Sequence, residues 1–245
     1  MSMRAPSSPF VHHPELEGKI TDPQTSFFRK FSIASVFAEK PELQWVLEKL
    51  RSESDRERSR AETLADYRDK DLWVFAYGSL MWDPAFHFAE VRRATVPGYD
   101  RRFVLKHTYG ARGTPDAPGL MAALDEGDCC EGLLFRIAAK DIETESEILW
   151  RREMVGHAYK PTFVTAMVED QAVTALTFVA DRSSEVICPD LTREEQIRFL
   201  ASGVGFLGTS KEYLSNIVRQ FAALGVVDED CSALLQEVED YLAAG

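Results

Sequence analysis

The sequence predicts an α+β fold, because its strand-like and helix-like segments fall largely in separate parts of the chain. Short apolar runs of high β-propensity dominate residues 72–180 of the 245. One helix-like segment, residues 141–154, interrupts them, and after residue 190 the pattern becomes helical. A chain of this length can bury a substantial core in one large domain that carries an extension.

Residues 1–70 are predicted to be an N-terminal extension to a main domain over residues 71–245. Four prolines with scattered Ser and His residues predict a flexible tail over residues 1–25. The phenylalanine-rich segment at residues 27–33 is a candidate for docking on the main body.

A helix is predicted to begin near Pro41, because apolar residues recur at helical spacing over residues 43–50. The charge-dense segment Arg51–Arg60 follows and predicts a solvated helix face. The simplest interpretation is a helical extension with no chemistry of its own.

The main domain is predicted to contain a series of short strands. They span residues 72–77, 90–97, 101–106, 119–124, 130–137, 162–169 and 172–180. The turn-prone residues Asp125–Asp128 are expected to separate two compact apolar strands. Glu169 and Asp170 lie between two further strands and predict a hairpin.

The helix over residues 141–154 has Asp141 as a candidate N-cap. Glu153 lies one turn beyond Leu149 and therefore shares its apolar face. Burial raises the pKa of a carboxylate on such a face, which suits proton transfer near neutral pH. The alternative interpretation is that Glu153 only pairs with a neighbouring arginine.

Two capping boxes predict the starts of helices after residue 190. They pair Thr192 with Glu195 and Thr209 with Glu212. Gly225 is placed to end the second of these helices, and a last amphipathic helix is expected over residues 231–243.

Composition and charge argue against several classes of protein. No run of 18 or more apolar residues predicts a membrane span, and no apolar secretory signal is visible. The four cysteines match no metal-binding spacing, which favours free thiols in a reducing compartment and predicts a cytoplasmic protein. The net charge of −12 comes from residues 71–245, with 16 basic and 28 acidic residues, and argues against nucleic acid as a partner. An anionic small substrate would therefore need local basic groups.

The most informative segment is Trp73–Trp82, an apolar strand that runs directly into a glycine turn. Gly78 has no Cβ, so the chain can bend sharply there, adopt a positive φ, or approach a ligand closely. Such a turn can leave the N–H groups of Gly78, Ser79 and Leu80 pointing into a shared concavity, which is the geometry of an anion or oxyanion site. An ordinary strand-to-loop turn is the alternative interpretation.

The same segment resembles the opening of the ChaC-type γ-glutamylcyclotransferases, a strand and loop with the pattern V-F-x-Y-G-S-L-x-W. Further segments resemble that family in the same order. They span residues 97–103, 110–120, 130–136, 149–154, 175–182 and 205–214. Together the motifs cover most of residues 71–240, and their collinear order makes the resemblance specific where one motif alone would be weak.

The resemblance implies a small mixed β-barrel surrounded by helices. It also implies an enzyme that cyclises the γ-glutamyl group of glutathione, releasing 5-oxoproline and cysteinylglycine. Glu153 matches the catalytic glutamate of the family, which implies a general base that then acts as general acid. No external nucleophile, metal or organic cofactor is expected, and proximity supplies much of the acceleration because the attack is intramolecular. The expected partner is the small-molecule substrate, with no nucleic acid and no membrane.

Six further residues are candidates for binding the substrate. They are Tyr77, Gly78, Ser79, Leu80, Arg112 and Tyr213. Arg112 could meet a substrate carboxylate with two hydrogen bonds, or could fix its own loop. Tyr213 matches a recurrent tyrosine of the family and could orient the substrate, or could anchor its helix in the core. Tyr159 could line the pocket, although packing is the favoured interpretation. The lone histidines His107 and His157 are expected to be structural or exposed.

Three other functions stay open from the sequence. A cyclotransferase for another γ-glutamyl amino acid or amine would share the fold. A non-catalytic γ-glutamyl-binding regulatory protein would use the N-terminal extension to cover the site or recruit a partner. A redox thiol protein would depend on Cys129 and Cys130, which lack a nearby basic residue in the sequence.

Overall fold

The computed structural model of the chain describes residues 8–67 and 69–244. Five strands close into a barrel in the order β1-β3-β2-β4-β5. They are β1 (Leu72–Ala76), β2 (Glu90–His107), β3 (Gly119–Ile137), β4 (Tyr159–Val168) and β5 (Gln171–Ala180). The predicted α+β fold, a small β-barrel surrounded by helices, is confirmed.

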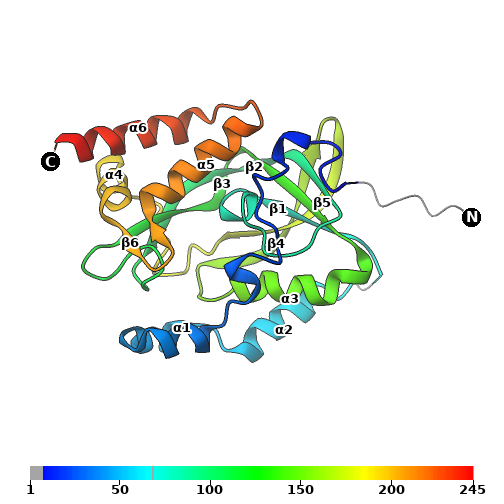
Figure 1. Cartoon of the computed structure of the whole chain (residues 1–245), viewed down its shortest axis with the longest axis horizontal. Helices are drawn as coiled ribbons and strands as arrows, with labels where there is room; N and C mark the ends of the chain where they lie inside the picture. Colours follow the sequence, from blue (N-terminus) through cyan, green and yellow to red (C-terminus); the bar gives the residue numbers. More distant parts are fainter. Residues whose placement is uncertain (1–7, 68, 245) are drawn as a thin grey trace, which may run out of the picture.

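Helices lie on two sides of the barrel (Figure 1). Near the N-terminus are α1 (Ile33–Glu39), the 3₁₀ helix η3 (Pro41–Lys49) and α2 (Glu53–Thr63), followed later by α3 (Ile142–Glu153). The C-terminal part contributes α4 (Arg193–Ser202), the short strands β6 (Val204–Gly205) and β7 (Gly208–Thr209), α5 (Ser210–Ala223) and α6 (Glu229–Ala244). In Figure 1, α2 and α3 lie on one side of the strands and α4 to α6 on the other.

The barrel depends on two long strands, β2 and β3, where the sequence predicted two short strands each. The predicted turn over Asp125–Asp128 is wrong, because these residues continue β3 and Asp125 pairs with Asp100 of β2. The Asp100 carboxylate accepts a hydrogen bond from the Cys129 N–H at 3.3 Å, so the polar run is satisfied within the sheet. A register shift between Pro97 and Tyr99 lets β2 bend at the position where the sequence suggested a break.

The remaining local predictions concern a turn and helix ends. Glu169 and Asp170 form the two-residue connection between β4 and β5, with Glu169 at a φ of 53°, so the hairpin is confirmed. Both capping boxes are present, and Gly225 follows α5 at a φ of 68°. Asp141 stands at the predicted N-cap position of α3, but its side chain makes no capping hydrogen bond because a 3₁₀ turn leads into the helix.

The described part of the N-terminal extension packs against the barrel instead of forming the predicted flexible tail; residues 1–7 lie outside the described residues. Leu16 is fully buried in the main core, and Ile20 is buried beside it. The Thr21 N–H donates to the Trp82 carbonyl at 2.8 Å, so this segment reaches the loop that follows β1. The boundary at residue 71 remains a prediction.

The charge-dense segment predicted as a solvated helix face forms most of α2, and most of it is exposed. Arg60 is the exception, because its side chain is only 8% exposed. It donates to Glu57 of its own helix, and to the Ser146 hydroxyl and the Glu143 carboxylate of α3 at 3.0 and 2.6 Å. This arginine therefore fastens the extension to α3.

Candidate active site

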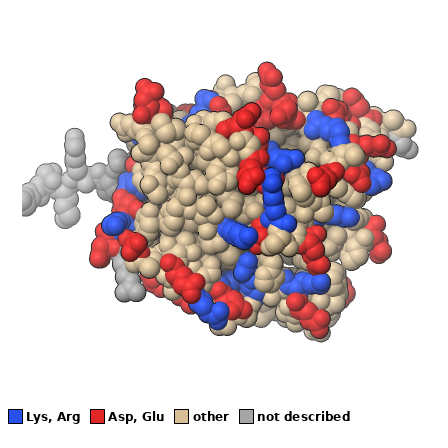
Figure 2. Space-filling view, turned by 180° about the vertical axis from the view of Figure 1, so that it is seen from behind, with Lys and Arg blue, Asp and Glu red and all other residues tan. Residues whose placement is uncertain are grey.

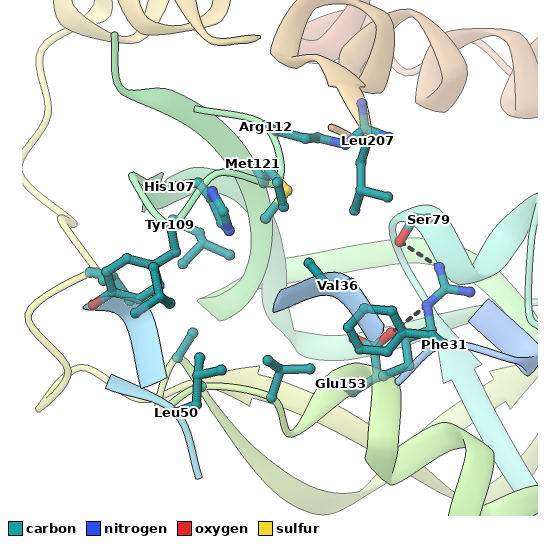
Figure 3. Close-up of a pocket in the computed structure, with 18 of the residues that line it drawn as sticks. Phe31, Val36, Leu50, Ser79, His107, Tyr109, Arg112, Met121, Glu153 and Leu207 are labelled. Carbon is teal, nitrogen blue, oxygen red and sulfur yellow. Dashed lines mark hydrogen bonds and ion pairs between the residues drawn. The ribbon is translucent and has the colours of Figure 1, made fainter. Parts of the chain in front are cut away.

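A cavity lies between the barrel and the N-terminal segment, and α3 ends at its edge (Figure 3). Four of the predicted site residues line it: Ser79, Arg112, Glu153 and Tyr213. The side chains of Tyr77 and Leu80 are buried and are not part of its wall. The structure thus brings together a loop, a helix end and a tyrosine that are far apart in the sequence.

Glu153 is the last residue of α3. Leu149 and Trp150 anchor the preceding turn in the core, with exposed fractions of 0% and 1%. This leaves the Glu153 side chain at the cavity wall and only 14% exposed. Burial raises the pKa of Glu153 above its usual value, while the adjacent Arg152 opposes that shift. The carboxylate is therefore suited to exchanging a proton.

Arg152 is a site residue that sequence reasoning treated only as a neighbour. Its Nε lies 3.0 Å from Glu153 Oε1, so the predicted alternative of a local ion pair does form. The same guanidinium donates to the Ser79 hydroxyl at 2.8 Å and to the Asp83 carbonyl. It also lies over the Phe28 ring, 4.1 Å from the centroid. Arg152 thus joins the carboxylate to the loop after β1, a link with no signal in local spacing.

The loop after β1 turns through a short 3₁₀ helix, Ser79–Met81. Within the described residues, the backbone N–H groups of Gly78, Ser79 and Leu80 have no hydrogen-bond acceptor. Gly78 has a φ of −137°, so a positive φ is not the reason for glycine here. A Cβ at this position would lie 2.6 Å from the Tyr213 hydroxyl oxygen. Glycine is needed because the tyrosine occupies the space of a side chain.

Tyr77 holds this loop from behind the cavity. Its hydroxyl donates to the Phe178 carbonyl at 2.8 Å, and its own carbonyl accepts from Arg101 Nε at 2.6 Å. Tyr159, for which the sequence left both packing and lining of the pocket open, lines the cavity, as does Tyr213. Burial raises the pKa of each of these three tyrosines, and the Glu153 carboxylate adds to the effect. All three are therefore neutral hydroxyl groups at physiological pH.

The charged groups of the cavity wall are mainly basic. Among the described lining residues, the cationic side chains are those of Lys106, Arg112 and Arg152, and the one carboxylate is that of Glu153. Arg112 donates to the Thr209 carbonyl at 2.9 Å and lies over the Tyr213 ring. On the face shown in Figure 2, acidic and basic side chains are interspersed around a broad uncharged area. The cavity is therefore a local basic site in a chain of net charge −12.

The other candidate groups have different environments. His107, expected to be structural or exposed, lines the cavity, and its buried Nδ1 has no hydrogen-bond partner among the described residues. Burial lowers the pKa of His107 to about 4, so the ring is neutral near pH 7. Cys129 is exposed, and burial raises the pKa of Cys130 to about 11, which leaves a thiol and not a thiolate. Within the described part of the chain, no group of three His, Cys, Asp or Glu residues could hold a metal ion.

The N-terminal segment supplies one wall of the cavity. Phe31, Val36 and Leu50 project into the cavity opposite the barrel (Figure 3). Docking of the phenylalanine-rich segment is confirmed, because Phe28 and Phe31 line the cavity.

Comparison with known proteins identifies the chain's relatives. The family described as ChaC-like protein matches residues 72–241. A glutathione-specific γ-glutamylcyclotransferase of Escherichia coli is 36% identical over 194 residues, which cover 78% of this chain and 84% of that protein. The glutathione-specific γ-glutamylcyclotransferase 1 of Rattus norvegicus is 30% identical over 178 residues, covering 70% and 80%.

The fold has a counterpart among solved structures. The crystal structure of a γ-glutamyl cyclotransferase specific to glutathione from yeast superposes with a TM-score of 0.63 at 20% identity. The match covers 70% of this chain and 99% of that one. At this identity the likeness concerns the fold alone. None of the described helices is long and apolar enough to cross a membrane.

Proposed function

The chain belongs to the ChaC-like protein family, and we propose that it is a glutathione-specific γ-glutamylcyclotransferase. The reaction closes the γ-glutamyl group of glutathione into 5-oxoproline and releases cysteinylglycine. The observation that carries the proposal is the buried Glu153 carboxylate in a cavity whose other charged groups are basic. Glutathione carries two carboxylates, which such a cavity can bind.

The chemistry needs no external nucleophile. The α-amino nitrogen of the γ-glutamyl group attacks its own side-chain amide carbon and forms the new C–N bond of a five-membered lactam. The C–N bond to the cysteine then breaks, and the departing nitrogen leaves as an amine. Holding the substrate folded supplies much of the acceleration, because the attack is intramolecular.

Glu153 has the proton-transfer role in this proposal. Its carboxylate takes a proton from the substrate ammonium group, which frees the nitrogen lone pair for attack, and returns a proton to the departing nitrogen. A carboxylate whose pKa is raised by burial holds that proton between the two steps better than an exposed one. Arg152 positions the carboxylate through its ion pair and its bond to Ser79.

The loop after β1 is proposed to hold the γ-glutamyl unit. The N–H groups of Gly78, Ser79 and Leu80 are free of acceptors in the described chain, and they can donate to the oxyanion that develops on the amide oxygen. Arg112 is the proposed partner for a substrate carboxylate, although its bond to the Thr209 carbonyl also fixes its loop. Tyr213 lies over Gly78 and is proposed to orient the substrate. The proposed roles of Tyr77 and Leu80 are to shape this loop from behind.

The alternatives from the sequence are less well supported. The relatives from Escherichia coli and Rattus norvegicus are both named for glutathione and not for another γ-glutamyl compound. A regulatory protein without activity would not require a buried carboxylate beside free N–H groups. A redox thiol role is not favoured, because Cys130 is held as a thiol. The proposal includes a cytoplasmic location, since the four cysteines are unpaired and a reducing compartment keeps them so.

Product analysis tests the proposal. The full chain is mixed with reduced glutathione, and in parallel with a γ-glutamyl dipeptide that lacks the glycine. We expect equal amounts of 5-oxoproline and cysteinylglycine from glutathione, and less product from the dipeptide. Free glutamate in place of 5-oxoproline would show attack by water and contradict cyclisation. Faster turnover of the dipeptide would contradict the assignment of glutathione.

A further inference from the structure

We propose that the apolar part of the cavity accepts the sulfur substituent of glutathione S-conjugates. The chain would then act on glutathione whose cysteine sulfur carries an apolar group, in addition to glutathione itself. This inference rests on the proposed function and names a wider substrate class for the same site.

The first observation is a wall of apolar side chains next to the catalytic carboxylate. The N-terminal contribution to the cavity is Phe28, Phe31, Ile33, Val36, Phe37, Leu43, Val46 and Leu50. Within α1, none of the apolar residues is buried, and Ile33, Val36 and Phe37 remain partly exposed to the cavity. Apolar surface left open inside a cavity is favourable to cover with an apolar ligand group.

The second observation is that the cavity extends well beyond the Glu153 carboxylate. In Figure 3, Ser79 and Glu153 lie toward one side, and Leu50 lies toward the other side, where His107 and Tyr109 also line the cavity. The barrel contributes Leu105, Met121 and other apolar groups to the same space. The cavity therefore continues beyond the carboxylate into a mainly apolar compartment.

The chemistry of glutathione indicates which part could occupy that compartment. The scissile amide nitrogen belongs to the cysteine. That cysteine has the glycine attached at its carbonyl and the sulfur on its side chain. The γ-glutamyl and glycyl branches each carry a carboxylate, and burying a carboxylate against apolar side chains is costly. The sulfur branch is uncharged, so it is the branch suited to the wall formed by α1 and η3. A bare thiol fills little of such a space, whereas an alkyl substituent would fill more of it.

The test is a series of S-alkyl glutathiones of increasing chain length: S-methyl, S-butyl and S-hexyl. The full wild-type chain is assayed with each one and with glutathione, and 5-oxoproline is measured. Each methylene that becomes buried should raise kcat/KM by about fourfold until the compartment is full. A value of kcat/KM that stays constant or falls along the series would overturn the inference.

A pair of variants on α1 locates the effect. Val36→Asp puts a carboxylate into the apolar wall, and Ala38→Asp puts the same group on the exposed side of the same helix. We expect Val36→Asp to lower kcat/KM for S-hexylglutathione at least tenfold more than it lowers kcat/KM for glutathione, because only the conjugate places an apolar group against this wall. Ala38→Asp should change neither. Equal losses on both substrates in Val36→Asp would overturn the inference, because the wall would then be a structural cover only.

The series also separates this inference from the proposed function. No 5-oxoproline from any substrate would contradict the proposed function itself. Production of 5-oxoproline from glutathione, with a decline as the substituent grows, would leave the proposed function intact and reject the S-conjugate class alone.

Discussion

Glu153 is poised between two opposing influences, burial and the guanidinium of Arg152. Burial disfavours its charge and Arg152 favours it, and burial is the larger effect, so the pKa is raised. Arg152 is itself held by Ser79 and Asp83, which keeps the pair in a fixed geometry. The carboxylate is therefore held in place while it remains able to take up a proton.

The raised pKa predicts the pH dependence of turnover. Only the ionised carboxylate can accept the substrate's proton, so kcat/KM for glutathione should fall as pH falls through the pKa of Glu153. The inflection should lie above 4.5, the ordinary value for a glutamate. Initial rates across the acidic range measure it, and an inflection at or below the ordinary value would contradict the burial argument.

The same shift predicts a stability effect of Glu153→Gln. A folded-state pKa above the unfolded value adds stability that is fully present below the unfolded pKa and is lost as pH rises through the folded pKa. At neutral pH the charged carboxylate therefore gives no benefit to folding, and the neutral glutamine should leave the melting temperature unchanged or raise it. Glu147→Gln, an exposed residue of the same helix, is the matched control and should have little effect. A clear fall in melting temperature for Glu153→Gln alone would contradict this prediction.

Individual roles were only partly predictable from the sequence. The position of Glu153 on the apolar face of its helix followed from spacing to Leu149, and the structure places it in a cavity. The hydrogen bonds from Arg152 to Ser79 and Asp83 join segments about 70 positions apart in the chain. Local sequence spacing cannot predict such contacts. His107 was predicted to be structural or exposed, and the structure places it in the cavity wall at the end of β2.

At the level of elements, the loop after β1 and helix α5 fit together through Gly78 and Tyr213. A Cβ on Gly78 would be 2.6 Å from the tyrosine oxygen but 3.7 Å from the ring carbon that bears it. The clash therefore concerns one oxygen atom. The loop can keep this conformation only while position 78 has no side chain, because the Tyr213 hydroxyl oxygen occupies that space.

This contact predicts a specific non-additivity. Gly78→Ala should lower the free energy of unfolding by about 1–3 kcal/mol, because a buried ring must move. In a Tyr213→Phe background the same substitution should cost much less, since the obstructing oxygen is gone. Urea unfolding of the two single variants and the double variant measures the coupling. Equal costs in both backgrounds would show that Gly78 is needed for another reason.

Element boundaries were predictable where the signal is local. The capping boxes of α4 and α5 and the hairpin after β4 depend on residues within a few positions of each other, and they were predicted correctly. The turn over Asp125–Asp128 was wrong, because pairing with β2 and the acceptance of hydrogen bonds by Asp100 override the turn preference of these residues.

For the whole molecule, the N-terminal extension belongs to the core of the fold and to the wall of the site. Leu16 is fully buried with residues of the barrel, and Arg60 bonds to α3. The sequence offered only polar and proline-rich composition for residues 1–25, and composition does not report contacts with distant strands. The resemblance to the ChaC-type family begins at the strand that follows the extension over residues 1–70. No family motif therefore indicated where the extension lies.

Packing of the extension predicts a large effect of Leu16→Ala. Removing a fully buried leucine side chain should lower the free energy of unfolding by about 2–5 kcal/mol, measured by urea denaturation. Val11→Ala is the matched control in the same segment, because that side chain is 57% exposed, and its effect should be within about 0.5 kcal/mol. Similar small effects from both would mean that the extension does not contribute to the core.

The central claim is that the buried carboxylate of Glu153 carries the cyclisation of glutathione. The most direct measurement is the rate of 5-oxoproline formation from reduced glutathione by the wild type and by Glu153→Gln, both checked for a cooperative unfolding transition. The account predicts formation by the wild type and a loss of about 10²–10⁴-fold in kcat for the variant. A folded Glu153→Gln protein that forms 5-oxoproline at the wild-type rate would contradict it.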